Sequence, residues 1–437
     1  MQNKNNIFNL FCCMLFMFLL VGFLQSWNLA LTIFNLCIIS SIMSLGINIQ
    51  WGNAGIVNFG VMGFAALGGL ANVIISMPPT NKAWETGGIY ILLGLSLFVL
   101  SVILSVFLWR KSTLSNKQKY FITIFIITIS YFLMRYIIDS PISAIESIEP
   151  AKTGYLGGFN LPVMISWPIG GLLAALTAYL IGKIALGLRS DYLAIATLGI
   201  SEIIIYVLKN EDWLSRGVKN VNGLPRPVPY EIELQSKSWI SEIANLTKTS
   251  LPEMSSIIVK ISYSLLFVFI LVVILILLEV ALKSPWGRMM RAIRDNEVSA
   301  NAMGKDIKKR HLQVFIIGSA IIGIAGAMLT TLDGQFTPVA YQPLRFTFLV
   351  WIMVIIGGSG NNFGSVLGGF IIWFFWIQSE PIGLWLISLI TSQISDANIV
   401  KIHLLENAAH MRLMFMGIIL LATLRFAPRG LIPEEKR

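Results

Sequence analysis

Two short polar stretches interrupt long apolar runs in nearly the same way. GNAGIVNFG occupies residues 52–60 and GGSGNNFG occupies residues 357–364, so each places Gly-x-x-Gly ahead of Asn-Phe-Gly. Glycine-interrupted segments at corresponding positions indicate a transport pathway, because unwound backbone offers N–H and C=O groups to a polar solute. Close helix packing is the alternative. The pathway candidates are Asn58, Phe59, Gly60, Gly360, Asn362 and Phe363.

Glu202 is a second candidate because it lies in an otherwise apolar run. A carboxylate at mid-membrane costs about 2.5–3.5 kcal/mol even on the lenient insertion scale, so it should face protein or water. Thr197 and Gly199 could place a hydroxyl group and accessible backbone near it. The alternative role is a structural ion pair or a buried hydrogen bond, with possible ion-pair partners Lys183, Arg135 and Arg345.

Other chemistry has little support in the sequence. Cys12, Cys13 and Cys37 lie in apolar runs, and the three histidines are scattered, so neither a disulfide framework nor a metal site is expected. The sequence contains no Gly-x-x-x-x-Gly-Lys-Ser/Thr phosphate loop, which excludes ATP binding by that route. A membrane enzyme ranks last, since few catalytic groups could converge.

The composition indicates what must position these residues. With 56% hydrophobic and 12% charged residues and a mean hydropathy of +0.76, the chain is expected to be an integral membrane protein. A helical span needs roughly 20 apolar residues. That length predicts an all-α polytopic membrane protein with about twelve (ten to twelve) transmembrane helices. The expected spans are 7–27, 29–50, 54–76, 89–109, 120–138, 161–187, 192–210, 256–282, 311–331, 344–357, 365–390 and 411–426.

The expected organisation is one transmembrane domain over residues 1–437. It comprises N-terminal spans (7–210), an extracytoplasmic loop (211–255), C-terminal spans (256–426) and a cytoplasmic tail (427–437). Lys and Arg concentrate in alternate loops, most of all in 283–310, which predicts that both termini are cytoplasmic. This distribution explains the net charge of +10 without nucleic acid. Lys260 and Glu279 lie near the ends of their run and are interpreted as snorkelling residues.

Residues 284–304 are expected to form one cytoplasmic helix. Ser284 suits the N-cap, Pro285 the first turn and Gly304 the end. Helical spacing gathers an apolar stripe that needs a surface to lie against, either anionic lipid or a groove on a cytoplasmic protein. Glu297 lies on this stripe and favours a protein partner. The stripe consists of Trp286, Met289, Met290, Ile293, Glu297, Ala300 and Gly304.

This stretch resembles the cytoplasmic coupling loop of ABC importer permeases, specifically those of the branched-chain amino acid family. In the general importer pattern a Gly follows the Glu by six residues, whereas Gly304 follows Glu297 by seven. The resemblance assigns ATPase coupling to Trp286, Arg291, Ile293, Arg294, Asp295, Glu297, Ala300 and Gly304.

Other stretches resemble the larger, LivM-like permease of the same family, in the family's order from about residue 45 onward. They are GNAGIVNFG (52–60), SDYLAIATLGISEII (190–204), NGLPRP (222–227), FLVWIMVIIGGSGNNFGSVLGG (348–369) and LRFAPRGLIP (424–433). Any one of them is a weak signal because Gly-rich apolar sequence is common in membrane helices. The ordered set is a strong one.

The resemblance implies a non-enzymatic permease subunit of an ATP-driven importer in a bacterial plasma (inner) membrane. The implied partners are two cytoplasmic ABC ATPase subunits, a second, LivH-like permease and an extracytoplasmic solute-binding protein. No cofactor is expected on this chain, because ATP and Mg are used by the ATPases. Branched-chain or other hydrophobic amino acids are the favoured substrates, with urea or short amides as the alternative. A self-sufficient, ion-coupled secondary transporter is the competing function.

Overall fold

The computed structural model describes residues 2–111, 115–149, 153–392 and 398–434, so residues 435–437 of the predicted tail lie outside it. Within these residues the fold is almost entirely helical, and ten helices are long and apolar enough to cross a membrane. They are α1 (Gln2–Leu24), α2 (Trp27–Ile47), α5 (Ile89–Lys111), α6 (Asn116–Glu146), α7 (Val163–Ala185), α8 (Ser190–Asn210), α12 (Leu251–Lys283), α15 (Ile307–Asp333), α17 (Asn362–Ile390) and α19 (Met411–Phe426).

Two further apolar helices are shorter, α3 (Val61–Ser76) and α16 (Pro343–Gly357). Each of the twelve predicted spans therefore falls on a helix, but only ten meet the length of a full crossing. The two short helices are those beside the glycine-rich interruptions. With 16 and 15 residues, they rise about 1.5 Å per residue and fall short of about 30 Å of hydrocarbon.

The centre of the bundle is built on close helix contacts. Helix α3 packs against α7 and α15, and α2 packs against α12, α15 and α17. At the α3–α15 contact a Cβ atom on Gly68 would collide with the Gly323 carbonyl group, so glycine allows the two backbones to touch. Helix α1 packs on this bundle through Phe18, whose ring meets Phe34 of α2 and Phe374 of α17.

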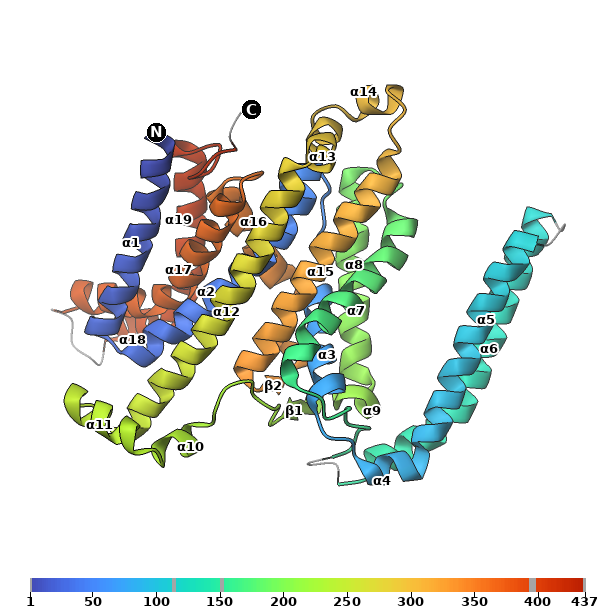
Figure 1. The fold of residues 1–437 in the computed structure, drawn as a ribbon, viewed down its shortest axis with the longest axis horizontal. Coiled ribbons are helices and arrows are strands. Elements are labelled where there is room, and N and C mark those ends of the chain that lie inside the picture. Colours follow the sequence, from blue (N-terminus) through green and yellow to red (C-terminus); the bar gives the residue numbers. More distant parts are fainter. Residues whose placement is uncertain (1, 112–114, 150–152, 393–397, 435–437) are drawn as a thin grey trace.

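Helices α5 and α6 form a hairpin that stands apart from the other helices (Figure 1). They pack mainly on each other, and α5 continues from α4 (Asn81–Ala83) and the π-helical turn η2 (Trp84–Gly88) at one end of the bundle. Apolar side chains such as Phe121 and Phe132 are largely exposed along the hairpin. This exposure suits contact with lipid chains on most sides of the hairpin.

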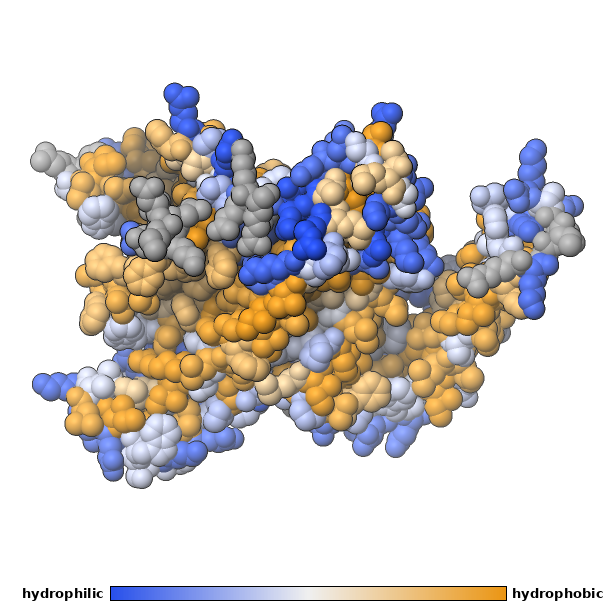
Figure 2. Space-filling view, turned by 45° about the horizontal axis from the view of Figure 1, so that its top comes forward, coloured by the Kyte–Doolittle hydropathy of each residue, from blue (hydrophilic) through white to orange (hydrophobic). Residues whose placement is uncertain are grey.

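The two ends of the bundle differ in structure. One end carries α13 (Pro285–Asp295), α14 (Glu297–Ala302) and both chain ends (Figure 1). The other carries α9 (Asp212–Ser215), α10 (Glu231–Gln235), α11 (Ser238–Thr247) and α18 (Ile399–Glu406). Between the hydrophilic ends the surface is an apolar belt (Figure 2), as expected of a membrane-embedded protein.

The loop after α8 combines the short helices α9, α10 and α11 with extended backbone. Strand β1 (Val221–Asn222) pairs antiparallel with β2 (Gln335–Phe336), so that Val221 lies opposite Phe336.

Several span boundaries differ from those predicted: α3 begins at Val61 and not at 54, α6 ends at Glu146 and not at 138, and α12 begins at Leu251 and not at 256. Pro252 and Glu253 fit a first helical turn, and they extend the helix beyond its apolar run.

The single helix expected over 284–304 is wrong. The chain forms α13 and α14, separated at Asn296, whose backbone is extended. The Asn296 side chain accepts a hydrogen bond from Ser299 N–H at 2.9 Å and so caps α14. Ser284 does precede α13, but its hydroxyl group donates to the carbonyl of Ala281 and makes no N-cap bond.

Candidate functional site

The two glycine-rich interruptions lie against each other, although about 300 residues separate them in the sequence. Gly52 ends the π-helical turn η1 (Asn48–Gly52), and a Cβ atom on Gly52 would collide with the backbone of Gly360. Asn48 joins the two stretches: its Oδ1 accepts from Gly360 N–H at 2.8 Å, and its Nδ2 donates to Asn362 Oδ1 at 3.0 Å. Residues 48–60 and 357–364 therefore form one unit, called here the paired break.

Glu279 of α12 extends this unit. Asn362 Nδ2 donates to Glu279 Oε1 at 2.9 Å, and the carboxylate also pairs with Lys283 at 3.1 Å. The interpretation of Glu279 as a snorkelling residue therefore missed its contact with the paired break. Lys260, interpreted in the same way, donates to the backbone carbonyl of Asn28 at 3.0 Å.

Asn58 organises the first half of the paired break. Its side chain is fully buried, accepts from Gly60 N–H at 2.7 Å and donates to Gln50 Oε1 at 2.9 Å. Its backbone carbonyl accepts from the Trp351 indole N–H at 2.9 Å, and the Phe59 ring packs on the same indole. The side-chain amide groups of Asn58 and Asn362 thus form hydrogen bonds within the protein, as expected of residues that hold the helices together. A role in the pathway stays a prediction.

Phe363 occupies a different position from its counterpart Phe59. It lies in the first turn of α17 and is 45% exposed. Asn361 caps that turn, with its Oδ1 accepting from the N–H groups of Phe363 and Gly364. The two phenylalanines therefore share a sequence pattern and differ in their packing.

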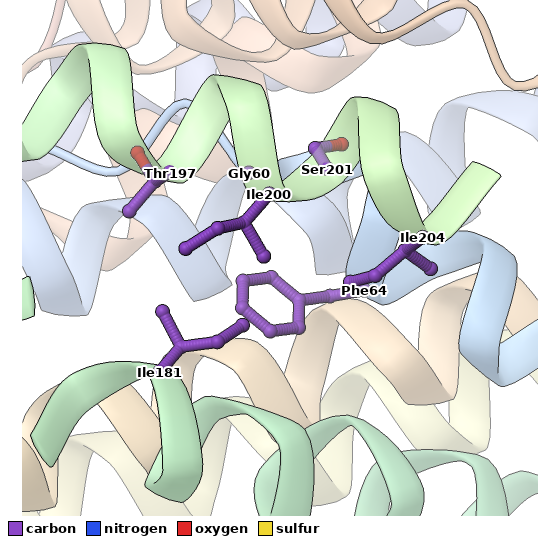
Figure 3. A pocket seen from close by; sticks show the side chains of 7 residues that line it. All are labelled: Gly60, Phe64, Ile181, Thr197, Ile200, Ser201 and Ile204. Atoms are coloured by element: carbon purple, nitrogen blue, oxygen red, sulfur yellow. The ribbon is translucent and has the colours of Figure 1, made fainter. Parts of the chain in front are cut away.

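Thr197 of α8 meets the paired break directly. The N–H of Phe59 donates to Thr197 Oγ1 at 3.0 Å, and the Gly63 N–H donates to Ser201 Oγ at 2.8 Å one turn later. The Phe64 ring lies beside these groups, between Ile200 and Ile181 of α7 (Figure 3), and leaves essentially no volume for a solute. The residues lining this small pocket are Gly60, Phe64, Ile181, Thr197, Ile200, Ser201 and Ile204.

The other two candidates on α8 do not join Thr197. Gly199 is exposed, with open space where a Cβ atom would be, and Glu202 is half-buried. Within the described residues Glu202 makes no hydrogen bond or ion pair. Its proposed partners interact elsewhere. Lys183 lies over the Tyr179 ring, Arg135 pairs with Asp139 and Glu211, and Arg345 lies over Trp376.

The apolar stripe of the 284–304 segment packs on the protein's own bundle. Met290 and Ile293 are 1% and 2% exposed and belong to the main core, and the Trp286 indole donates to Gln313 Oε1 at 3.2 Å. Ala300 is buried as well. Met290, Ile293 and Ala300 of the stripe are therefore covered by the protein itself, whereas Glu297 and Gly304 at its far end are exposed. Binding of a partner by the stripe stays a prediction.

A different surface of the segment remains available. Glu297 and Asp295 are exposed, and Val298 and Met303 are 80% and 78% exposed. Gly304 follows with a positive φ of 74° and no atom near the place of a Cβ. We call Asp295, Glu297, Val298 and Met303 the outer face of the segment. The predicted residue Arg291 is half-buried beside this face.

Arg294 turns inward and connects α13 to the paired break. One guanidinium nitrogen donates to the Gly52 carbonyl at 2.5 Å and to Glu434 Oε2 at 2.9 Å, and the other terminal nitrogen pairs with Asp295 at 3.0 Å. Burial by itself would lower the pKa of Arg294, but hydrogen bonds and charge from Glu434 and Asp295 raise it above its ordinary value. The cation is therefore permanent.

A strap near the C-terminus, residues 430–434, closes the second half of the paired break. Leu431 N–H donates to the Ile356 carbonyl and Ile432 N–H to the Gly357 carbonyl, both at 2.9 Å. Asn361 Nδ2 donates to the Pro433 carbonyl at 3.2 Å. The strap brings Glu434 to Arg294, so three remote parts of the chain meet at one point.

A cavity of about 320 Å³ lies among α2, α3, α15, α16 and α17. It reaches Asp333, the last residue of α15, at the end of that helix opposite α14. Its lining is mainly apolar and includes one charged side chain, that of Asp333. The lining residues are Leu36, Ile39, Ser40, Met43, Met62, Leu329, Asp333, Gln335, Thr337, Ala340, Tyr341, Phe346, Val350 and Trp373.

Sequence reasoning missed this cavity and the linking role of Asn48. The cavity draws between one and four residues from each of five helices, so no local pattern marks it. Asn48 carried a signal that was not used: it is a fully buried amide inside an apolar span. A polar side chain of that kind is expected to have a partner within the protein.

Comparison with known proteins decides the family. The family model for the branched-chain amino acid transport system / permease component matches residues 29–424. This chain belongs to that family. Its ten described helices that are long and apolar enough to cross a membrane agree with a multi-pass permease component.

Several branched-chain amino acid permeases are similar to this chain in sequence. The high-affinity branched-chain amino acid permease LivM of Escherichia coli is 29% identical over 47% of this chain and 48% of its own length. The LivM of Salmonella typhimurium is 28% identical over 46% and 47%. The chain thus spans about half the length of these two relatives. A probable LivM of Methanocaldococcus jannaschii is 25% identical over 60% of this chain and 67% of its own. No solved structure matches.

The described residues contain no group of three or more His, Cys, Asp or Glu side chains that could hold a metal ion. The permease's polar chemistry lies instead in amide, carboxylate and guanidinium groups at the paired break and in the cavity.

Proposed function

We propose that this permease belongs to an ATP-driven importer for branched-chain or other hydrophobic amino acids in a bacterial inner membrane, with both termini cytoplasmic. Urea or short amides are the alternative substrates. Its partners would be two cytoplasmic ABC ATPases, which use ATP and Mg, a LivH-like second permease and an extracytoplasmic solute-binding protein. The α9–α11 region of the 211–255 loop lies at the end expected to meet the binding protein.

One observation carries the proposal: the α13–α14 segment has an outward surface and an inward attachment. Its outer face presents Glu297, Val298 and Met303, while Arg294 is bonded to Gly52 in the paired break. A partner that binds the outer face would thus push on a segment bonded to the interrupted helices. ATP-driven closure of the ATPases would move the segment and shift the permease between outward and inward states.

The competing function, a self-sufficient secondary transporter, needs no such external surface. In that case the exposed Val298 and Met303 side chains would have no partner protein to cover them. Co-purification distinguishes the two functions, because only an importer subunit should carry an ATPase through purification.

The test is purification of the N-terminally tagged chain from its native membrane in mild detergent, with co-purifying proteins identified. We expect an ATPase and a second permease with the wild type, and loss of the ATPase with Glu297→Arg. Glu242→Arg is the matched control, since Glu242 is exposed on α11 at the opposite end. A wild-type chain that emerges alone or as a homo-oligomer would support the secondary transporter.

A further inference from the structure

We propose that the cavity among α2, α3, α15, α16 and α17 is a solute site for a zwitterionic α-amino acid with an apolar side chain, in which Asp333 accepts the ammonium group. This inference rests on the proposed transport function and extends it. It assigns a recognition residue within the permease itself, and it selects amino acids over urea and short amides.

The walls of the cavity suit an aliphatic side chain. Ile39 and Met43 of α2, Leu329 of α15 and Val350 of α16 contribute apolar surface. About 320 Å³ lies at the lower end of the range for small-molecule sites. Burying an aliphatic group here would gain hydrophobic free energy, whereas urea has no apolar group to bury.

Asp333 provides the charge that an ammonium group needs. It is the one charged side chain in the lining, and within the described residues it makes no hydrogen bond or ion pair. The side chain is exposed, so its carboxylate is open to the cavity mouth. An unpaired carboxylate at the edge of an apolar cavity favours a cationic group over a neutral amide, because a charge-assisted hydrogen bond is the stronger one.

Two polar atoms in wall residues lack partners as well. Thr337 Oγ1 and Trp373 Nε1 are buried and make no hydrogen bond with the described part of the chain. By contrast, the neighbouring Tyr341 hydroxyl is paired with Thr330 Oγ1 at 2.9 Å. Buried donors without an acceptor are costly and rare. Both atoms are, however, shielded from the cavity itself, so recognition of the solute rests on Asp333 and the apolar walls.

The experiment measures ATP-driven uptake into proteoliposomes that contain the complete complex and its binding protein. Radiolabelled L-leucine and urea are the probes. We expect wild type to take up leucine and Asp333→Asn to lower that uptake about tenfold or more, because the solute ammonium group loses its charged acceptor. Glu85→Gln is the matched control, because it removes an exposed carboxylate of η2 at the same end of the bundle and outside the 211–255 loop. Leucine binding to the isolated binding protein and basal ATPase activity should not change, which shows intact assembly.

The outcomes distinguish a failure of the solute-site inference from a failure of the proposed importer function. If Asp333→Asn takes up leucine as fast as Glu85→Gln, the assigned role of Asp333 is overturned while the importer stands. If wild type takes up urea and not leucine, the importer again stands and the amino-acid site does not. If ATP drives uptake of neither probe, the proposed function falls together with this inference.

Discussion

Arg294 shows how much one side chain can connect. Its guanidinium group touches the Gly52 carbonyl, Glu434 and Asp295, which places α13, the first interruption and the strap around one cation. The contacts with Gly52 and Glu434 lie on the inner side of the segment, and the contact with Asp295 reaches the outer face. A change at Arg294 should therefore affect the transmission of movement more than the binding of a partner.

We expect Arg294→Gln to lower ATP-driven uptake about tenfold, since coupling between sites is commonly worth a factor of 5–150. The ATPase should still co-purify, in contrast to Glu297→Arg. Arg288→Gln is the control, because Arg288 is exposed on the same helix and, within the described residues, its side chain bonds only to the Lys283 carbonyl group. Loss of the ATPase from Arg294→Gln would contradict this division of roles.

The buried amides of the paired break should matter for stability. Asn362→Leu leaves Asn48 Nδ2 without its acceptor and Glu279 Oε1 without a donor. Each orphaned group costs about 1–3 kcal/mol, so the melting temperature of the purified complex should fall. Asn58→Leu should act similarly.

Asn301→Leu is the control for both, as Asn301 is exposed on α14. If the double variant Asn58→Leu, Asn362→Leu keeps normal stability and loses uptake, the amides serve the pathway. If stability falls while the remaining folded complex transports normally, the interruptions serve packing alone.

A role of the Glu202 charge in solute transport stays a prediction. It is half-buried on α8 and has no hydrogen bond or ion pair among the described residues. Glu202→Gln preserves its shape and removes the charge, so membrane insertion should be unchanged and solute uptake altered. Equal uptake by the two proteins at matched expression would reject a role for the charge.

Single residues were predictable where the local sequence carries the cause. Glycine and asparagine marked the interruptions, and the structure places Thr197 against Phe59. The inward turn of Arg294 was not predictable, because helical spacing puts a residue on a face and does not say which face is covered. Met290 and Ile293 are covered by the protein's own helices, which a periodic pattern cannot distinguish from a partner.

At the scale of elements, the break at Asn296 sets the shape of the α13–α14 segment. Asn296→Ala removes the cap that receives Ser299 N–H, at a cost of about 1 kcal/mol. We expect α14 to fray and the ATPase to co-purify less. Asn301→Ala, within α14, is the control, since alanine favours helix there. An unchanged ATPase yield with Asn296→Ala would show that α13 alone supports binding.

The apolar runs predicted all twelve helical segments because burial in lipid demands long hydrophobic helices. The number of full membrane crossings could not be predicted from these runs, because the unwound residues of the two interruptions shorten α3 and α16. The sequence alone does not decide whether Asn296 lies inside one long helix or caps the start of a second helix. Asparagine suits an N-cap, but it is also tolerated inside a helix.

At the scale of the whole molecule, the fold depends on contacts between remote segments. The Asn48–Asn362 hydrogen bond joins residues 314 positions apart. No local pattern encodes such pairing, although the repeated Asn-Phe-Gly did suggest that the two stretches are related. The cavity could not be predicted from a local sequence pattern for the same reason, because five helices contribute to its lining.

The strap also has a consequence for biogenesis. The Ile356 and Gly357 carbonyl groups receive their donors from Leu431 and Ile432, which the ribosome makes more than seventy residues later. During synthesis these carbonyls must stay accessible to water or to a temporary donor, because orphaned backbone groups are costly in lipid. Insertion of α16 and α17 therefore precedes completion of their junction, and quality-control proteases would meet this junction open in any chain that stalls before the strap emerges.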